Sequence, residues 1–316
     1  EAVPVDILFI LDESGSMDYT LTSDQDAEWW EQSRMDLLET SAKTLIDTIE
    51  KNEDIDARYS AVSFSRAQWG ETKSWTDVSG IREFIEDLQP DGGTNYQKGI
   101  YDGKTLLKSA RKNALTFVIF VSDGEPTYRG VDVDNYTGDY WYGNGQNDDD
   151  GKNIAAAVRE ILGMSCTYFY AIGMGPEFGT DQWGSKLQGT LNLENLANNV
   201  NAAETGVYSA NNTEDLEQAF VEIATSVTFF SVKNVQVMDP LSDYADLVLN
   251  DNGKAEFTIT VKREEGNKTW TDTVESGETL TFQDKENRDI IVTARTSQDG
   301  RTIYLDFPED YELEEG

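Results

Sequence analysis

Four short runs of apolar and β-branched residues predict strands that are buried on both faces of a sheet. They are Val5–Leu11, Arg58–Phe64, Leu115–Val121 and Thr167–Gly173. Between these runs, apolar residues recur at the spacing of amphipathic helices. These helices are expected at Met35–Ile49, Ile81–Leu88, Tyr96–Leu107, Ile154–Leu162, Leu193–Asn198 and Leu216–Val227. The alternation predicts an α/β fold, a doubly wound and mostly parallel sheet with helices on both faces. The segment Ala67–Trp75 is expected to form an antiparallel edge hairpin.

The pattern changes near residue 230, where helical spacing gives way to alternating apolar positions. Strands are expected at residues 232–237, 255–261, 290–293 and 302–307, separated by turn sequences such as Asp239-Pro240 and Asp299-Gly300. We therefore expect two domains, an α/β domain over residues 1–229 and a β-rich module over residues 230–316. The module is expected to be a small antiparallel structure, an incomplete sandwich, because little chain follows its last strand.

Oxygen-bearing side chains gather at the ends of the predicted strands. The first strand ends in Asp12, followed by the hydroxyls of Ser14 and Ser16, and the strand Leu115–Val121 ends next to Asp123. A Gly-Gly turn before a helix adds the hydroxyl of Thr94. The carboxyl ends of parallel strands meet at one edge of a sheet, which is where such folds bind ligands. Two carboxylates and three hydroxyls there predict a site for a hard cation.

Each of these segments has an ordinary alternative, because a polar residue after a strand is usually a turn and a threonine before a helix is usually a cap. Their joint occurrence at the same edge favours a metal site. Glu13 and Glu125 lie beside the ligands and are expected to adjust the local charge without binding the metal.

Composition narrows the chemistry further. The formal net charge is −35, from 60 acidic and 25 basic residues, which argues against nucleic acid and anionic membrane surfaces as partners. The chain has no His, which removes Ser-His-Asp and Cys-His catalysis. Its one Cys, Cys166, lies in an apolar run and is expected to be a core thiol, so zinc is nearly excluded. Magnesium is the first choice of metal, with calcium or manganese as alternatives.

The segments 9–17, 92–95 and 121–127 together resemble the von Willebrand factor A family and its metal-ion-dependent adhesion site. The resemblance extends over roughly residues 3–228, and all five motif positions match. It implies that Ser14, Ser16 and often Thr94 bind one divalent cation directly, while Asp12 and Asp123 act directly or through water. It also implies that an exposed acidic side chain of a protein ligand completes the coordination of the metal.

Two long loops are expected on the same face as the metal. Residues 18–33 contain Trp29 and Trp30, and residues 128–151 contain Tyr140 and Trp141. Exposed aromatic residues in polar, glycine-containing loops are typical of recognition surfaces, so these four are predicted to contact the ligand. The alternative is that the rings only anchor the loops against the domain.

The residues after position 230 are similar to the segment that follows A-type domains in Gram-positive surface and pilus-tip adhesins. Lys233 could form an isopeptide bond of the kind found in such modules, and this is left open. No run of about 20 apolar residues and no leader peptide is present, so the sequence reads as a mature fragment. Covalent attachment or attachment to a pilus would use regions outside this sequence.

The resulting hypothesis is a non-enzymatic, extracellular protein of the bacterial cell wall or pilus that binds a protein through a divalent cation. One alternative is an intracellular A-type domain that assists an ATP-driven metal-insertion or assembly machine. A metal-dependent hydrolase is less favoured, because only the carboxylates themselves could serve as a general base.

Overall fold

The computed structural model describes residues 2–66, 70–130, 141–228, 236–240, 249–263, 268–284, 287–297, 302–308 and 311. The chain forms two units, Glu1–Thr228 and Phe229–Gly316. Within the described ranges, no helix is long and apolar enough to cross a membrane.

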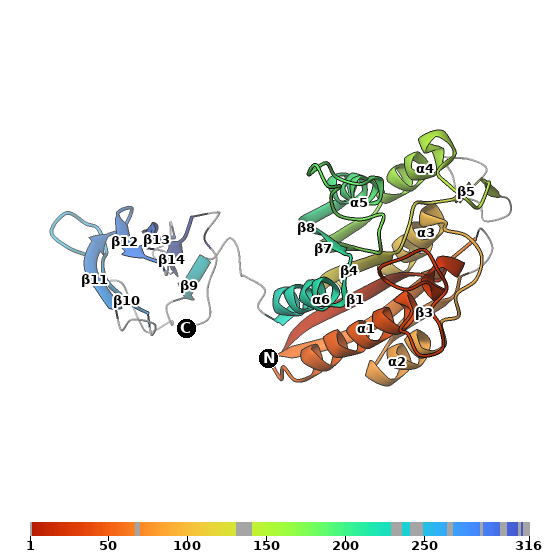
Figure 1. Ribbon diagram of the computed structural model, residues 1–316. Helices are drawn as coiled ribbons and strands as arrows, with labels where there is room; N and C mark the ends of the chain where they lie inside the picture. Colours follow the sequence, from red (N-terminus) through yellow and green to blue (C-terminus); the bar gives the residue numbers. More distant parts are fainter. Residues whose placement is uncertain are drawn as a thin grey trace. The chain divides into compact units, whose positions relative to one another are not determined.

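A six-stranded sheet in the order β3-β2-β1-β4-β7-β8 forms the centre of the first unit (Figure 1). The strands are β1 (Val3–Asp12), β2 (Ile55–Phe64), β3 (Thr72–Thr76), β4 (Leu115–Ser122), β7 (Ser165–Met174) and β8 (Asn201–Ala210). Neighbouring strands are parallel except that β3 runs antiparallel to β2. The predicted mostly parallel sheet is confirmed. The edge strand β3 lies within and just after the predicted hairpin segment, of which residues 67–69 are outside the described ranges.

Helices cover both faces of this sheet, as the sequence predicts. They are α1 (Arg34–Glu50), α2 (Val78–Glu86), α3 (Tyr96–Leu107), α4 (Lys152–Ile161), α5 (Gln188–Asn199) and α6 (Thr213–Thr228). On one face α1 packs against α6 and α2, and on the other α4 lies between α3 and α5 (Figure 1). The central strands are buried on both sides, and every side chain from Val5 to Leu11 is fully inaccessible to solvent.

Two parts of the sheet layer were not predicted from the sequence. The strand β8 pairs only with β7 at the sheet edge, and most of its side chains are exposed or half-buried, so it lacks an apolar pattern. The helix α5 begins at Gln188, five residues before the expected start at Leu193. Its first turn buries Gly189 and Thr190, which are not the large apolar residues that reveal helical spacing.

The second unit consists of small antiparallel sheets, as predicted. One sheet has the order β12-β13-β14-β9 and the other pairs β10 with β11. These strands are β9 (Gln236–Pro240), β10 (Glu256–Arg263), β11 (Lys268–Glu275), β12 (Thr279–Gln283), β13 (Asp289–Thr296) and β14 (Thr302–Asp306). Phe257 of β10, Val274 of β11 and Ala294 of β13 share one small core, so the two sheets pack together. Lys233, the residue considered for an isopeptide bond, lies outside the described ranges.

The parallel arrangement of β1, β4 and β7 decides where functional loops emerge, because their carboxyl ends lie at the same edge of the sheet. The loops after Asp12, Ser122 and Met174 all leave from this edge.

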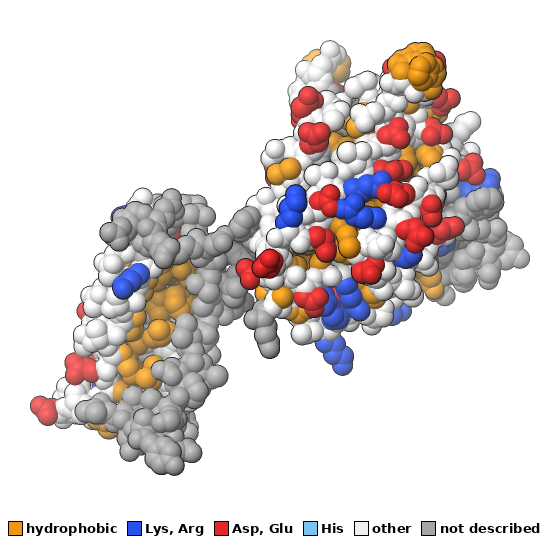
Figure 2. Space-filling view, turned by 90° about the horizontal axis from the view of Figure 1, so that it is seen from below, with side chains coloured by type: hydrophobic (Ala, Val, Ile, Leu, Met, Phe, Trp, Pro, Cys, Tyr) orange, Lys and Arg blue, Asp and Glu red, His pale blue; other side chains and the backbone are white. Residues whose placement is uncertain are grey.

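The chain has more acidic than basic residues, 60 against 25. Figure 2 shows Lys and Arg side chains scattered among Asp and Glu side chains on the visible face of the first unit.

Candidate metal-binding site

Asp12 is the last residue of β1 and is fully buried. Its Oδ1 accepts a hydrogen bond from the backbone N–H of Ser14 at 2.9 Å, which fixes the tight turn that follows the strand. Its Oδ2 accepts a hydrogen bond at 2.5 Å from the hydroxyl of Ser122, which is the last residue of the neighbouring strand β4. The carboxylate is therefore held from two strands in one orientation.

Asp123 directly follows β4 and is also buried. Its Oδ1 accepts hydrogen bonds from the hydroxyl of Ser16 at 2.9 Å and from the hydroxyl of Ser14 at 3.5 Å. The two serine Oγ atoms lie 3.2 Å apart. Four of the five predicted metal ligands, Asp12, Ser14, Ser16 and Asp123, are thus linked by hydrogen bonds at one sheet edge.

The loop of the fifth predicted ligand, Thr94, is joined to both of the other loops through the backbone. The N–H of Gly15 donates to the carbonyl of Gly92 at 2.9 Å, and the carbonyl of Thr94 accepts from the N–H of Thr127 at 2.8 Å. Thr94 is buried, and its side-chain hydroxyl makes no hydrogen bond with any residue that the structure describes. The hydroxyl therefore remains available for a ligand.

The electrostatics of the pair of aspartates fit a cation. Burial, followed by the negative charge of Asp123, raises the pKa of Asp12 to about 7 although Ser122 and Ser14 donate hydrogen bonds to it. Burial also raises the pKa of Asp123, because the opposing effect of Arg34 is smaller. Two carboxylates that are costly to ionise side by side favour a cation between them. The described residues contain no group of three or more Asp, Glu, Cys or His side chains that could hold a metal ion, so a cation at this edge would need the hydroxyls as further ligands.

A buried arginine that the sequence analysis did not single out contacts this site. Arg34 is the first residue of α1, and its side chain is only 1% exposed. Its Nη1 donates to Oδ2 of Asp123 at 2.8 Å, on the opposite side of the carboxylate from the serines. The sequence holds one signal for it, because a cation in the first turn of a helix opposes the helix dipole and requires another reason to be there.

Glu13 and Glu125, the two acidic residues beside the predicted ligands, each make a hydrogen bond with a residue outside the ligand set. Oε1 of Glu13 accepts the backbone N–H of Gln89 at 2.8 Å, which ties the first loop to the segment after α2. The N–H of Glu125 donates to Oε2 of Glu177 at 3.1 Å. Burial, followed by the charge of Glu125, raises the pKa of Glu177, a third acidic residue close to the site that the sequence did not reveal.

Residues 7–125, which include all five predicted ligands, match the family model of the von Willebrand factor type A domain. The first unit is a von Willebrand factor type A domain. The resemblance inferred from the sequence motifs is thereby confirmed for the fold, whereas the metal ligands stay a prediction. Residues 232–316, in the second unit, match a family described as a domain of unknown function (DUF7604).

Solved structures with this fold include proteins of bacterial pili. The PilB minor pilin from Streptococcus sanguinis is similar with a TM-score of 0.57 and 21% identity, over 72% of this chain and 62% of that chain. The pilus adhesin SpaC from Lactobacillus rhamnosus GG is similar with a TM-score of 0.53 and 17% identity, over 97% of this chain and 39% of that chain. At such identities the likeness concerns the fold alone.

A similar sequence among characterised proteins is the inter-alpha-trypsin inhibitor heavy chain H2 of Homo sapiens. It is 22% identical over 267 residues, which is 79% of this chain. This chain spans only 22% of the length of that relative. The activity and the partners of the whole relative therefore do not transfer to this chain.

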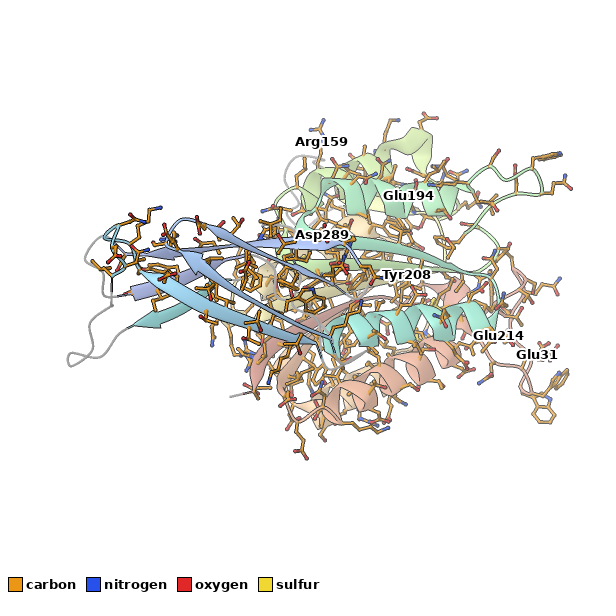
Figure 3. All side chains as sticks on the ribbon, turned by 90° about the vertical axis from the view of Figure 1, so that its left-hand side faces the viewer. Glu31, Arg159, Glu194, Tyr208, Glu214 and Asp289 are labelled. Atoms are coloured by element: carbon orange, nitrogen blue, oxygen red, sulfur yellow. The ribbon has the colours of Figure 1, made fainter. Side chains whose placement is uncertain are left out.

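The loop between β1 and α1 of the von Willebrand factor type A domain presents two tryptophans to solvent. Trp29 is 89% exposed and Trp30 is 65% exposed, and their rings contact edge to face with centroids 5.2 Å apart. Figure 3 shows Glu31, the neighbour of Trp30, on the outer side of the first unit, in the loop that leads into α1. Tyr140 and the side chain of Trp141, the other two predicted contact residues, lie outside the described part of the structure.

A third exposed tryptophan lies in the loop after β7, where the sequence analysis did not expect one. Trp183 is 80% exposed at the tip of a tight turn. Oδ1 of Asp181 accepts the N–H groups of Trp183 at 2.9 Å and of Ser185 at 2.8 Å, which makes the turn rigid. The sequence could have indicated this exposed ring, because Trp183 lies next to Gly184 in a polar segment and has no apolar neighbours in the sequence to pack against.

Cys166 is half-buried near the start of β7, and burial raises the pKa of its thiol to about 12. A thiol with so high a pKa is almost entirely protonated at neutral pH and is a poor nucleophile. This agrees with a structural role for the one cysteine of the chain.

Proposed function

We propose that the von Willebrand factor type A domain binds a protein ligand through one divalent cation held by Asp12, Ser14, Ser16, Thr94 and Asp123. The observation that carries the proposal is the contact of Asp123 with the hydroxyls of Ser14 and Ser16. These two serines directly follow β1, whose last residue, Asp12, accepts a hydrogen bond from Ser122 next to Asp123. Two loops far apart in the sequence thereby present carboxylate and hydroxyl oxygens to the same point. Such oxygens are the ligands of magnesium, calcium and manganese.

The charge of the site favours an acidic ligand group once the cation is bound. When both aspartates are ionised, the buried groups Asp12, Asp123 and Arg34 together carry one net negative charge without metal. Asp24, on the other side of the guanidinium, is largely exposed to solvent, so its charge is screened. A divalent cation would turn the charge of the buried groups into one net positive charge, and it would supply a Lewis-acidic position for one more oxygen ligand. A very acidic protein can in this way bind a carboxylate of another protein.

The contact surface around the metal is proposed to include Trp29 and Trp30, with Tyr140 and Trp141 as further candidates. Exposed indoles stabilise complexes because they bury a large area and lose few rotamers on binding. The edge-to-face contact of Trp29 with Trp30 already restricts both rings. We expect binding and not catalysis, because the carboxylates of the site are engaged by hydroxyls and by Arg34.

We further propose an extracellular location on a bacterial cell wall or pilus, with a role in adhesion. The support is the likeness of the chain to a minor pilin and a pilus adhesin, and the strongly acidic composition. The second unit would then connect the domain to the rest of a surface protein.

A binding screen tests this function. The purified chain is immobilised and exposed to matrix and cell-surface proteins in magnesium, in chelator, and after magnesium is restored. The proposal expects at least one partner that binds in magnesium, leaves in chelator and returns, and that is lost in Asp12→Asn. Partners whose binding is equal in magnesium and in chelator would show that the protein binds through another surface.

A further inference from the structure

The starting observation is a buried guanidinium whose five N–H groups face two different parts of the first unit. Nη1 of Arg34 contacts Asp123, the predicted metal ligand. On the other side, Nη2 donates to the carbonyl of Ser23 and to Oδ1 of Asp24, both at 3.0 Å. Nε donates to the carbonyl of Thr20 at 3.1 Å. A single side chain thus connects the site with the loop between β1 and α1.

The loop itself is a closed structure built around these contacts. The N–H of Thr20 donates to the carbonyl of Gln25 at 3.0 Å, and the N–H of Ala27 donates to the carbonyl of Asp18 at 2.8 Å. The N–H of Arg34 donates to the carbonyl of Tyr19 at 2.8 Å, so the ends of the loop are joined. Trp29 and Trp30 lie on the limb that returns to α1, and neither ring is buried against the domain. The position of both indoles therefore depends on the hydrogen bonds that close the loop.

Two neighbouring groups, the backbone of Gly175 and the ring of Tyr19, pack closely around the guanidinium. The end of β7 approaches it closely, since a Cβ built on Gly175 would lie 2.9 Å from Cζ of Arg34. The ring of Tyr19 lies 5.5 Å from the same carbon, a favourable cation–π distance. Burying a guanidinium at the positive end of a helix is unfavourable unless its donors are satisfied and its charge is balanced. Only an arginine has a planar group with donors for all of these acceptors.

We propose that Arg34 is a positioning residue that joins the Trp29–Trp30 loop to Asp123 in one hydrogen-bonded unit, and that its charge limits the affinity of the site for a divalent cation. The second part rests on the proposed function, and the first does not. Arg34 orients Oδ1 of Asp123 toward Ser14 and Ser16 by binding Oδ2. Its positive charge also repels a cation in the site. Because Arg34 offsets the charge of one aspartate, the two carboxylates do not fully neutralise a divalent cation, and the remaining positive charge attracts an acidic group of the ligand.

The first test follows amide hydrogen exchange of residues 19–33 in chelator, with the whole chain. Arg34→Lys keeps the charge but loses the planar donor group, and Asp24→Asn weakens the contact on the loop side, where the carboxylate is largely exposed. Both variants are expected to exchange at least tenfold faster in this loop and normally elsewhere. Arg82→Lys, at an arginine paired with Asp47 on the surface, is the matched control and is expected to leave the loop unchanged. Loop exchange at the wild-type rate in both test variants would overturn the link.

The second test titrates magnesium alone at pH 8, where protons compete little for the carboxylates. Arg34→Met removes the charge and is expected to bind magnesium about tenfold more tightly than wild type, whereas Arg34→Lys stays within about threefold. A residue with a purely structural role would give the opposite result, because a disturbed site binds metal more weakly. Weaker binding in Arg34→Met overturns the charge effect. If Arg34→Met does not fold, Arg34→Gln, which is also uncharged and keeps an amide donor, replaces it in the same titration, and weaker binding there overturns the charge effect. A wild-type protein that binds no divalent cation contradicts the proposed function, and the exchange experiment still decides the link.

Discussion

The hydroxyl of Ser16 donates a hydrogen bond to the carboxylate of Asp123 at 2.9 Å, although the two residues are 107 positions apart in the sequence. The contact exists because β1 and β4 are parallel neighbours whose carboxyl ends meet. The loop after β1 and the loop after β4 are therefore in contact through their side chains in the absence of any metal or ligand.

Replacing Asp12 with Asn is expected to stabilise the metal-free protein. The substitution removes one of two buried carboxylates that repel each other, while an amide oxygen still accepts from Ser14. Thermal unfolding in chelator at pH 7 should show a gain of roughly 1–2 kcal/mol, and added magnesium should no longer raise the melting temperature of the variant. A variant that melts below the wild type in chelator would show that Asp12 is structural.

Asp6, a buried aspartate at the other end of β1, is expected to behave in the opposite way. Burial alone would raise the pKa of Asp6, but hydrogen bonds from Arg58 and Arg111 outweigh this effect and lower it. A carboxyl group with a lowered pKa stabilises the fold above its ordinary pKa of 3.8 and loses this contribution as the pH falls further. Urea unfolding at pH 7 should show that Asp6→Asn costs about 2–4 kcal/mol, a difference that shrinks as the pH falls below about 4.

Asp6→Asn also serves as the control for Asp12→Asn, since both replace a buried aspartate of the same strand. Magnesium should stabilise Asp6→Asn as much as it stabilises the wild type. Loss of the magnesium effect in Asp6→Asn would mean that the effect reports the fold and not the site.

Gly93 is expected to tolerate no side chain, because a Cβ built there would lie 2.3 Å from Cε2 of Tyr128. Gly93→Ala should therefore displace the loop that carries Thr94, lower stability by about 1–3 kcal/mol and weaken magnesium binding. Gly124→Ala is the matched control, since the nearest atom to its Cβ is Oε2 of Glu177 at 3.6 Å, an ordinary contact. Equal effects of the two substitutions on calorimetric metal binding would argue against a specific role of the Thr94 loop.

Replacing either exposed tryptophan of the first loop is expected to weaken ligand binding without affecting the fold. Trp29→Ala or Trp30→Ala should cost roughly 1–3 kcal/mol of binding energy, measured by a biosensor on a partner found in the screen. Stability and magnesium affinity should change by less than about 0.5 kcal/mol, because the rings are exposed and do not bind metal. Trp183→Ala is the control on another loop, and an equal loss there would contradict the assignment of recognition to Trp29 and Trp30.

Much of the site edge could be predicted from the sequence, and the reason is physical. The buried strands β1 and β4 have continuous apolar sequences, so the sequence places their ends at one edge, with Asp12 as the last residue of β1 and Asp123 directly after β4. The hydroxyls of Ser14 and Ser16 come with the first of these ends. The glycines before Thr94 indicated its tight turn, and Gly92 indeed has a positive φ of 77°.

Other parts depend on tertiary contacts that leave no periodic pattern. The place of Arg34 in the first turn of a helix is unusual for a cation, but the sequence does not show that the long loop returns over it and buries it. The strand β8 lies at the edge of the sheet with most of its side chains exposed or half-buried, so it has no continuous apolar sequence. Trp183 depends on a turn closed by Asp181, whose geometry is not encoded in hydrophobic spacing.

The most direct test of the account is a crystal structure of the chain grown with manganese, whose anomalous signal locates the ion among the oxygen ligands that it shares with magnesium. The account predicts one strong anomalous peak at the carboxyl ends of β1 and β4, bonded to the hydroxyls of Ser14 and Ser16, with Asp12, Thr94 and Asp123 binding it directly or through water. Replacing manganese with magnesium should leave contacts of about 2.1 Å. An anomalous map from manganese-saturated crystals with no peak at this edge, or with its main peak elsewhere on the chain, would contradict the central claim.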